Sequence, residues 1–314
     1  MSRRSVETVL VDCMGLQPSE TLLVLTDPKR RPIAEALVSR ARELGAETLL
    51  MEMSEREANG TEPPPPAAAA MLECDVCIAP TTKSVSHTAA RKEANARGVR
   101  VATMPQITED MLERTMAADY KEVQRRSREL ADALSAGSEV RITSPQGTDI
   151  TLGIEGRDGI ADDGDLTAPA SFGNLPAGEG FIAPVEGATN GVIAFDGSVF
   201  PVGLLEEPIV VRIEEGYAVD FSGPDADAWR ATMDPHGPEA FAVAELGIGT
   251  NEAAKLTGNV LEDEKIMGTI HVALGDNHTF GGTVRVSSHQ DGIVRTPTLT
   301  IDGRTYVESG RLLL

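Results

Sequence analysis

Few cysteines, no long apolar run and a shortage of basic residues set the first limits on this 314-residue chain. Three cysteines, an odd and low count, do not build a disulfide framework and indicate a reducing compartment. No apolar run approaches the roughly 20 residues of a membrane-spanning helix. The basic residues at the N-terminus lead into no apolar signal core. The sequence therefore predicts a cytoplasmic protein with no membrane partner.

Basic side chains are outnumbered by acidic ones. The chain has 28 Lys and Arg against 49 Asp and Glu, a formal net charge of −21. A surface this acidic repels phosphate backbones, so no nucleic-acid partner is expected. The string from Gly173 to Gly178 and Glu179 lacks the lysine of a phosphate-binding loop, and no Gly-x-Ser-x-Gly elbow is present. These absences leave a smaller set of enzyme chemistries open.

The first part of the chain alternates strand-like and helix-like patterns. Short apolar runs at 21–25, 48–51, 76–79 and 99–104 are separated by helical patterns at 33–44, 67–72 and 86–96. Such alternation is typical of a parallel α/β layer. A longer helix is predicted over 117–136, with Gly137 at its end. We therefore expect an α/β domain over residues 1–136.

The composition changes after residue 137. Gly, Val, Thr and Ile dominate, and turn signals are frequent. A hairpin is predicted from 140–143 and 149–152, with further strands at 209–213, 269–274 and 298–301 and a helix at 238–246. We expect residues 137–314 to form an α+β domain with a mostly antiparallel sheet that carries a metal site.

Candidate metal ligands gather in this second domain. Three of the five histidines, His271, His278 and His289, fall within 19 residues (289 − 271 + 1). On a strand, His289 and Asp291 project from the same face, so both can bind one cation. Divalent metals take imidazole and carboxylate ligands together, and Glu179 and Glu245 are further carboxylate candidates. Taken alone, these residues also suit solvated strand positions and an exposed helix end.

Several sequence blocks recur in the same order in one superfamily. The chain resembles the thermophilic aminopeptidases (aminopeptidases T and S, leucyl aminopeptidase type), a superfamily that also contains the 2,5-dihydroxypyridine 5,6-dioxygenases. The blocks cover about residues 171–302, and the first domain matches more loosely through Ser84–Arg91 and 102–105. The main blocks are Asn174-Leu175-Pro176, 244–251, Asp263-Glu264-Lys265, 268–275, Gly281-Gly282 and His289-Gln290-Asp291.

The resemblance implies a two-metal aminopeptidase, which is our first expectation. Its ligands match Glu179, Glu245, His271, His289 and Asp291, with Glu245 as the bridge and a catalytic residue. Two zinc, cobalt or manganese ions per chain would activate a water that releases the N-terminal residue of a peptide. His278 stands near the place of the aminopeptidases' tyrosine and is the candidate for oxyanion stabilisation.

Two alternatives remain open. In a ring-cleaving dioxygenase, His271, His289 and Asp291 would form the facial triad of one non-haem Fe(II), with a small aromatic substrate. Glu179 and Glu245 would then be outer-sphere groups or substrate contacts. A metal-stabilised scaffold without activity is the other alternative. The resemblance also implies substrate contacts from His87 and Arg91 and a homodimer. Lys265 either pairs with a ligand carboxylate or is exposed.

Overall fold

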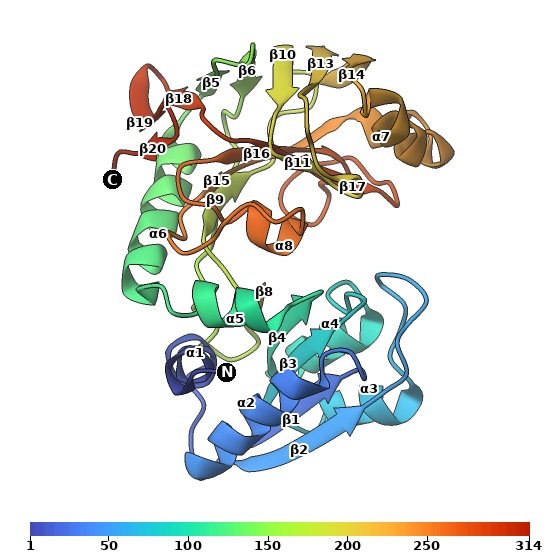
Figure 1. The fold of residues 1–314 in the computed structure, drawn as a ribbon, viewed down its shortest axis with the longest axis vertical. Helices are drawn as coiled ribbons and strands as arrows, with labels where there is room; N and C mark the ends of the chain where they lie inside the picture. The colour runs from blue at the N-terminus through green and yellow to red at the C-terminus, as the bar shows by residue number, and fades with distance from the viewer. The chain divides into compact units, whose positions relative to one another are not determined.

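The computed structural model describes all residues from 1 to 314 and separates into two compact units. Unit 1 comprises Met1–Lys121 and Gly164–Ala177, and unit 2 comprises Glu122–Asp163 and Gly178–Leu314. One parallel and two antiparallel sheets confirm the expected mixed α/β class (Figure 1). None of the helices combines the length and the apolar character needed to cross a bilayer.

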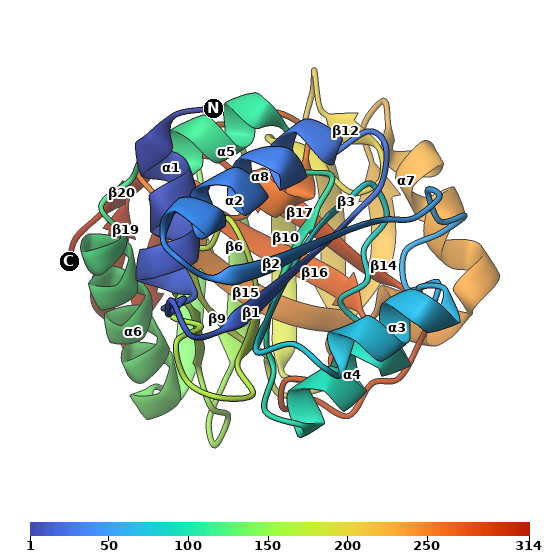
Figure 2. The ribbon, with the colours of Figure 1, turned by 90° about the horizontal axis from the view of Figure 1, so that it is seen from below.

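Unit 1 is built on a five-stranded parallel sheet in the order β2-β1-β3-β4-β8. Its strands are β1 (Thr21–Thr26), β2 (Glu47–Glu52), β3 (Val76–Thr81), β4 (Arg100–Pro105) and β8 (Phe172–Asn174). Its helical elements are α1 (Arg3–Glu7), η1 (Thr8–Cys13), α2 (Arg31–Glu43), α3 (Pro65–Met71), α4 (Ala89–Ala96) and α5 (Glu109–Thr115). Figure 2 shows α2 on one face of this sheet and α3 and α4 on the other.

Unit 2 contains two antiparallel sheets. The eight-stranded sheet has the order β14-β13-β10-β6-β5-β18-β19-β20, and the seven-stranded sheet has the order β12-β11-β17-β16-β15-β9-β7. The first comprises β5 (Glu139–Thr143), β6 (Asp149–Gly153), β10 (Thr189–Phe195), β13 (Ile209–Glu214), β14 (Tyr217–Ser222), β18 (Thr298–Ile301), β19 (Arg304–Glu308) and β20 (Arg311–Leu312). The second comprises β7 (Ile160–Asp162), β9 (Glu179–Ile182), β11 (Ser198–Val199), β12 (Gly203–Leu204), β15 (Val243–Gly249), β16 (Ile270–Gly275) and β17 (His289–Val294).

The helical elements of unit 2 are α6, whose first two residues belong to unit 1, α7, α8 and two short 3-10 turns. Their bounds are α6 (Tyr120–Ala136), α7 (Ala226–Met233), η2 (Asp234–His236), η3 (Pro238–Phe241) and α8 (Val260–Asp263). The sequence predicts α6 as the end of the first domain. Its buried Leu130 and Leu134 instead pack in the core of unit 2, while 164–177 return to unit 1 and supply β8. The contacts therefore divide the chain differently from the expected boundary at residue 136.

The two sheets of unit 2 share one hydrophobic core. Apolar side chains of the eight-stranded sheet, such as Val140 and Ile150, belong to the same cluster as Leu246 and Val272 of the seven-stranded sheet. Buried Trp229 of α7 joins this cluster. Successive side chains of a strand point to opposite faces. Because one face of the seven-stranded sheet is committed to the core, its other face is available for polar side chains.

The helix predicted over 238–246 is wrong. Pro238–Phe241 form a 3-10 turn, and Val243–Gly249 form the buried strand β15 between β9 and β16. Leu246 and Ile248 lie in the core, so Glu245 falls on the opposite face at the strand period of two. The short apolar run was ambiguous between the two periods, and the sheet partners decided it.

Candidate metal centre

The five predicted ligands lie on four adjacent strands of the seven-stranded sheet. Glu179 is in β9, Glu245 in β15, His271 in β16, and His289 and Asp291 are in β17. The register aligns Glu245 with Ala273 and Ala273 with Asp291. It also aligns His271 with Gly247, two residues beyond Glu245. All five side chains therefore share the face that is turned away from the core.

Small residues give these side chains room. A Cβ atom on Gly247 would stand 2.1 Å from Cε1 and 2.2 Å from Nε2 of His271. Ala273, which separates Glu245 from Asp291 across the sheet, is the next small residue on this face. The imidazole of His271 therefore lies against a glycine, in space that any larger residue would fill.

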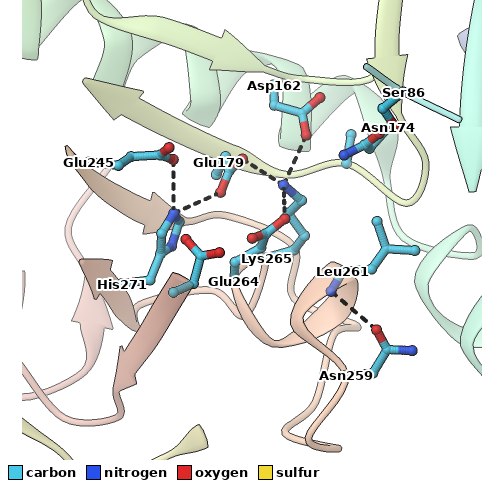
Figure 3. A network of polar contacts seen from close by, with 12 residues as sticks. Ser86, Asp162, Asn174, Glu179, Glu245, Asn259, Leu261, Glu264, Lys265 and His271 are labelled. Atoms are coloured by element: carbon cyan, nitrogen blue, oxygen red, sulfur yellow. Dashed lines mark hydrogen bonds and ion pairs between the residues drawn. The ribbon is translucent and has the colours of Figure 1, made fainter. Parts of the chain in front are cut away.

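The imidazole nitrogens converge on one carboxylate. His271 Nε2 lies 3.3 Å from Glu245 Oε1 and 3.3 Å from Glu179 Oε2 (Figure 3). His289 Nε2 lies 3.4 Å from Glu245 Oε2 and 3.5 Å from Asp291 Oδ1. With metal–ligand distances of about 2.0–2.1 Å, ligand atoms of one cation stand roughly 3.0–3.4 Å apart. The observed spacings fit a metal centre.

Hydrogen bonding also fits a metal. His289 Nδ1 contacts the main-chain oxygen of Asp276 at 2.8 Å, which leaves Nε2 facing the carboxylates. Outer-sphere bonds of this kind orient metal-binding histidines. Oε2 of Glu179 is buried and accepts no hydrogen bond. Such an orphaned oxygen is costly unless a cation or another partner satisfies it. The ring of His271 has no such outer-sphere bond, because its Nδ1 is buried without a hydrogen-bond partner.

Burial and mutual charge shift the titration of these groups. Burial raises the pKa of Glu179 to about 8, against the opposing effect of the Lys265 ammonium. Burial by itself would lower the pKa of His271, but the carboxylates of Glu179 and Glu245 raise it to about 9. The pKa of His289 is raised well above its usual value because Asp291 and Glu245 outweigh its burial. Without a metal, both imidazoles therefore carry protons at neutral pH.

Metal binding is therefore expected to release protons and to tighten as the pH rises toward 9. Each displaced proton weakens the apparent affinity by up to about tenfold per pH unit below the raised pKa. The stability of the metal-free protein depends on pH in the opposite direction and falls as the pH rises. The stabilisation from protonated His271 is complete below its ordinary pKa of 6.5 and is lost as the pH passes about 9. Calorimetric titration with Mn(II) in buffers of different ionisation enthalpy measures how many protons are released when the metal binds. A metal affinity that stays the same between pH 6 and pH 9 would contradict this expectation.

Three further charged residues adjoin the predicted ligands. Lys265, left open between pairing and exposure by the sequence, is buried, and its Nζ lies 2.5 Å from Glu179 Oε1. The same Nζ lies 2.8 Å from Glu264 Oε1 and 3.0 Å from Asp162 Oδ2 (Figure 3). Glu264, Glu179 and His271 offer ligand atoms within 4.8 Å of one another. Glu264 and Lys265 lie in one of the superfamily sequence blocks, which pointed to both as site residues. No sequence feature pointed to Asp162.

The other predicted site residues belong to a loop of unit 2 and to unit 1. His278 is exposed on the loop after β16, and its Nδ1 lies 2.7 Å from Asp276 Oδ1. No hydrogen bond or ion pair joins His278 to the five predicted ligands. In unit 1, Arg91 Nε donates to the Ser86 main-chain oxygen at 2.6 Å, and its guanidinium lies 3.9 Å from the ring centre of Phe172. His87 is exposed. Substrate contacts from His87 and Arg91 stay predictions.

Comparison with known proteins places these residues in context. Residues 3–314 match the family described as NicX, 2,5-dihydroxypyridine 5,6-dioxygenase. No curated protein matches the chain. Among solved structures, it is similar to 2,5-dihydroxypyridine dioxygenase from Pseudomonas putida KT2440, with a TM-score of 0.84, 18% identity and coverage of 98% of this chain and 96% of that chain. It is also similar to wild-type AmpT from Thermus thermophilus, with a TM-score of 0.74, 16% identity and 99% coverage of both chains.

These matches confirm the superfamily resemblance that the sequence blocks indicated. At such low identities the two solved structures show a shared fold. The family match, in contrast, extends over nearly the whole chain. It favours the dioxygenase alternative over the aminopeptidase that was expected first.

Proposed function

This chain belongs to the 2,5-dihydroxypyridine 5,6-dioxygenase family, and from this premise we propose that it is an iron-dependent enzyme that cleaves the ring of a dihydroxylated aromatic substrate with O₂. The observation that carries the proposal is the match of residues 3–314 to this family, and the two histidines beside one carboxylate supply the metal centre that it needs. His271 Nε2 and His289 Nε2 face the two oxygens of Glu245 at 3.3 and 3.4 Å.

We assign the metal to His271, His289 and Asp291. Two imidazoles and one carboxylate are the protein ligands of non-haem Fe(II) oxygenases, and they leave positions open for substrate and O₂. Bound Fe(II) would supply the one-electron chemistry with O₂ that side chains lack. In this assignment Glu245 lies beside the metal-facing Nε2 atoms of both imidazoles, where it would contact a bound substrate. The main-chain oxygen of Asp276 fixes the ring of His289 through its other nitrogen.

A two-metal hydrolase is the second candidate. The cluster of Glu179, Glu264 and His271 favours it, because these ligand types could hold a further cation. The similarity of fold to AmpT agrees with it. Glu245 would then be among the residues that hold two zinc, cobalt or manganese ions, which would supply an activated water for peptide hydrolysis. A role for His278 in stabilising an oxyanion belongs to this candidate alone.

Oxygen uptake separates the two candidates. Protein reconstituted anaerobically with Fe(II) is mixed with 2,5-dihydroxypyridine or a catechol in an oxygen electrode, and the Zn(II), Co(II) and Mn(II) forms are mixed with leucine-terminated peptides. We expect oxygen consumption with the iron form and no amino acid release from any form. Amino acid release without oxygen uptake would overturn the proposal and favour the hydrolase. Asp291→Asn is the control, and it should be inactive in either case.

Two expectations about the whole protein accompany this proposal. A small-molecule substrate agrees with the family, while the homodimer and the cytoplasmic location stay predictions. Size-exclusion chromatography with light scattering measures whether the protein is a homodimer. A mass of about one chain in solution would contradict the homodimer.

A further inference from the structure

A buried lysine lies against the acidic side of the proposed metal centre. The Lys265 side chain is 1% exposed, and its Nζ contacts Asp162, Glu179 and Glu264 at 3.0, 2.5 and 2.8 Å. An ammonium has three N–H donors and no acceptor. The ammonium therefore has one carboxylate oxygen for each of its three N–H donors (Figure 3).

The sheet register explains why a cation is needed here. Asp162 of β7 stands directly opposite Glu179 of β9. Like charges at opposed positions of an antiparallel pair repel each other. The chain delivers the lysine on a fixed main chain: Lys265 N donates to the Glu262 oxygen and Lys265 O accepts from Asn251 N, both at 2.9 Å. The ammonium therefore has a fixed place between carboxylates that would otherwise repel.

The lysine also decides which oxygen of Glu179 faces His271. It occupies Oε1 of Glu179, so that Oε2 of the same carboxylate has no hydrogen bond and faces His271 Nε2 at 3.3 Å. It occupies Oε1 of Glu264 while Glu264 keeps a ligand atom within 4.8 Å of those of Glu179 and His271. One side of each glutamate is thus bound to the lysine, and the carboxylates stay close to His271.

We propose that Lys265 is a positioning residue that fixes the carboxylates of Glu179 and Glu264 beside His271 for metal binding. The inference rests on the proposed function only in that the centre binds a metal. It holds for either reaction. Without the ammonium, nothing holds Asp162, Glu179 and Glu264 together, and their side chains turn away from one another. The carboxylates are then no longer held in place beside His271, and the metal binds more weakly.

The test compares metal affinity in four full-length proteins by calorimetric titration with Mn(II). Lys265→Met keeps the length of the side chain without the charge, Lys265→Gln keeps a hydrogen-bond donor, and Lys92→Met removes an exposed lysine of α4 as the matched control. Outer-sphere changes weaken metal binding by about 10–100-fold. We expect this loss in Lys265→Met, a smaller loss in Lys265→Gln, and the wild-type dissociation constant in Lys92→Met.

A second readout separates positioning from mere stability. The thermal unfolding midpoint of each metal-free variant is measured, and activity is measured at saturating metal. Positioning predicts that excess metal restores most of kcat in the folded variant. If Lys265→Met does not fold, Lys265→Gln decides by the same measurements. Wild-type affinity in the folded Lys265 variant would overturn the proposal. Binding of one additional metal per chain would also overturn it, because the lysine would then replace a cation.

The proposed function and this inference fail differently. Wild-type protein that binds no metal would contradict the metal centre itself. Wild-type protein that binds metal, together with an unchanged Lys265→Met variant, would contradict only the role of Lys265.

Discussion

Replacing His289 by alanine is expected to remove metal binding and activity while the fold persists, and replacing Asp291 by alanine should do the same. His289 Nε2 approaches both Glu245 and Asp291, so its loss removes a ligand and the group that faces two carboxylates. The affinity loss should exceed the roughly 10–100-fold cost of removing an outer-sphere partner. The His289 side chain is 31% exposed, so its truncation leaves no large cavity in the core.

Metal analysis after equilibrium dialysis, together with circular dichroism, measures both expectations. His236→Ala is the matched control, because His236 is an exposed histidine of the same unit whose Nδ1 lies 2.9 Å from Ser287 Oγ. It should retain the wild-type metal content. A wild-type content in His289→Ala and in Asp291→Ala would refute the assignment of these ligands.

Replacing Gly247 by alanine is expected to destabilise the protein and to displace His271. The added Cβ would stand 2.1 Å from His271 Cε1, far inside van der Waals contact. His271 is fully buried, so its ring has little space in which to move. Overpacking of a buried site costs about 1–3 kcal/mol. Urea unfolding of the metal-free protein should show a loss in this range, and metal binding should be lost as well.

The double variant Gly247→Ala/His271→Ala tests the cause. Because the clash involves the two positions together, the double variant should be more stable than Gly247→Ala alone, with a non-additive term of about 0.5–3 kcal/mol. A double variant no more stable than Gly247→Ala would show that the glycine serves the strand itself and not the imidazole. Neither variant should bind metal.

The arrangement of unit 1 was largely predictable because its elements alternate clearly. The buried run of β3 and the amphipathic pattern of α2 agree with the predicted strand and helix. Central strands of a parallel sheet are buried on both faces and give continuous apolar runs. The hairpin of β5 and β6 was predictable from its turn residues and alternating pattern.

Glu245 shows where local patterns were insufficient. Its run of Val, Ala, Glu and Leu suits a helix as well as a strand, and only the pairing with β9 and β16 decides between them. Lys265 and Asp162 show a second limit. Lys265 is 103 residues from Asp162 in the chain (265 − 162), and only the sheet brings them together. A charge cluster assembled from separate loops and strands leaves no local pattern.

The type of reaction could not be predicted from the residue types. Histidine, aspartate and glutamate suit one iron and two hydrolytic metals equally at the level of residue types. Glu179 and Glu245 favoured two metals when only the sequence was considered. In the structure Glu179 is already bound by Lys265, and the family match extends over residues 3–314. The contact between Lys265 and Glu179 cannot be read from the residue types alone.

The metal content of protein purified anaerobically, without added metal or chelator, tests the central claim most directly. Elemental analysis is followed by reconstitution, so that metal lost during purification is restored. We predict about one equivalent of iron per chain, bound by His271, His289 and Asp291. Two equivalents of zinc, cobalt or manganese would contradict the dioxygenase proposal, and no bound metal after reconstitution would contradict the metal centre altogether.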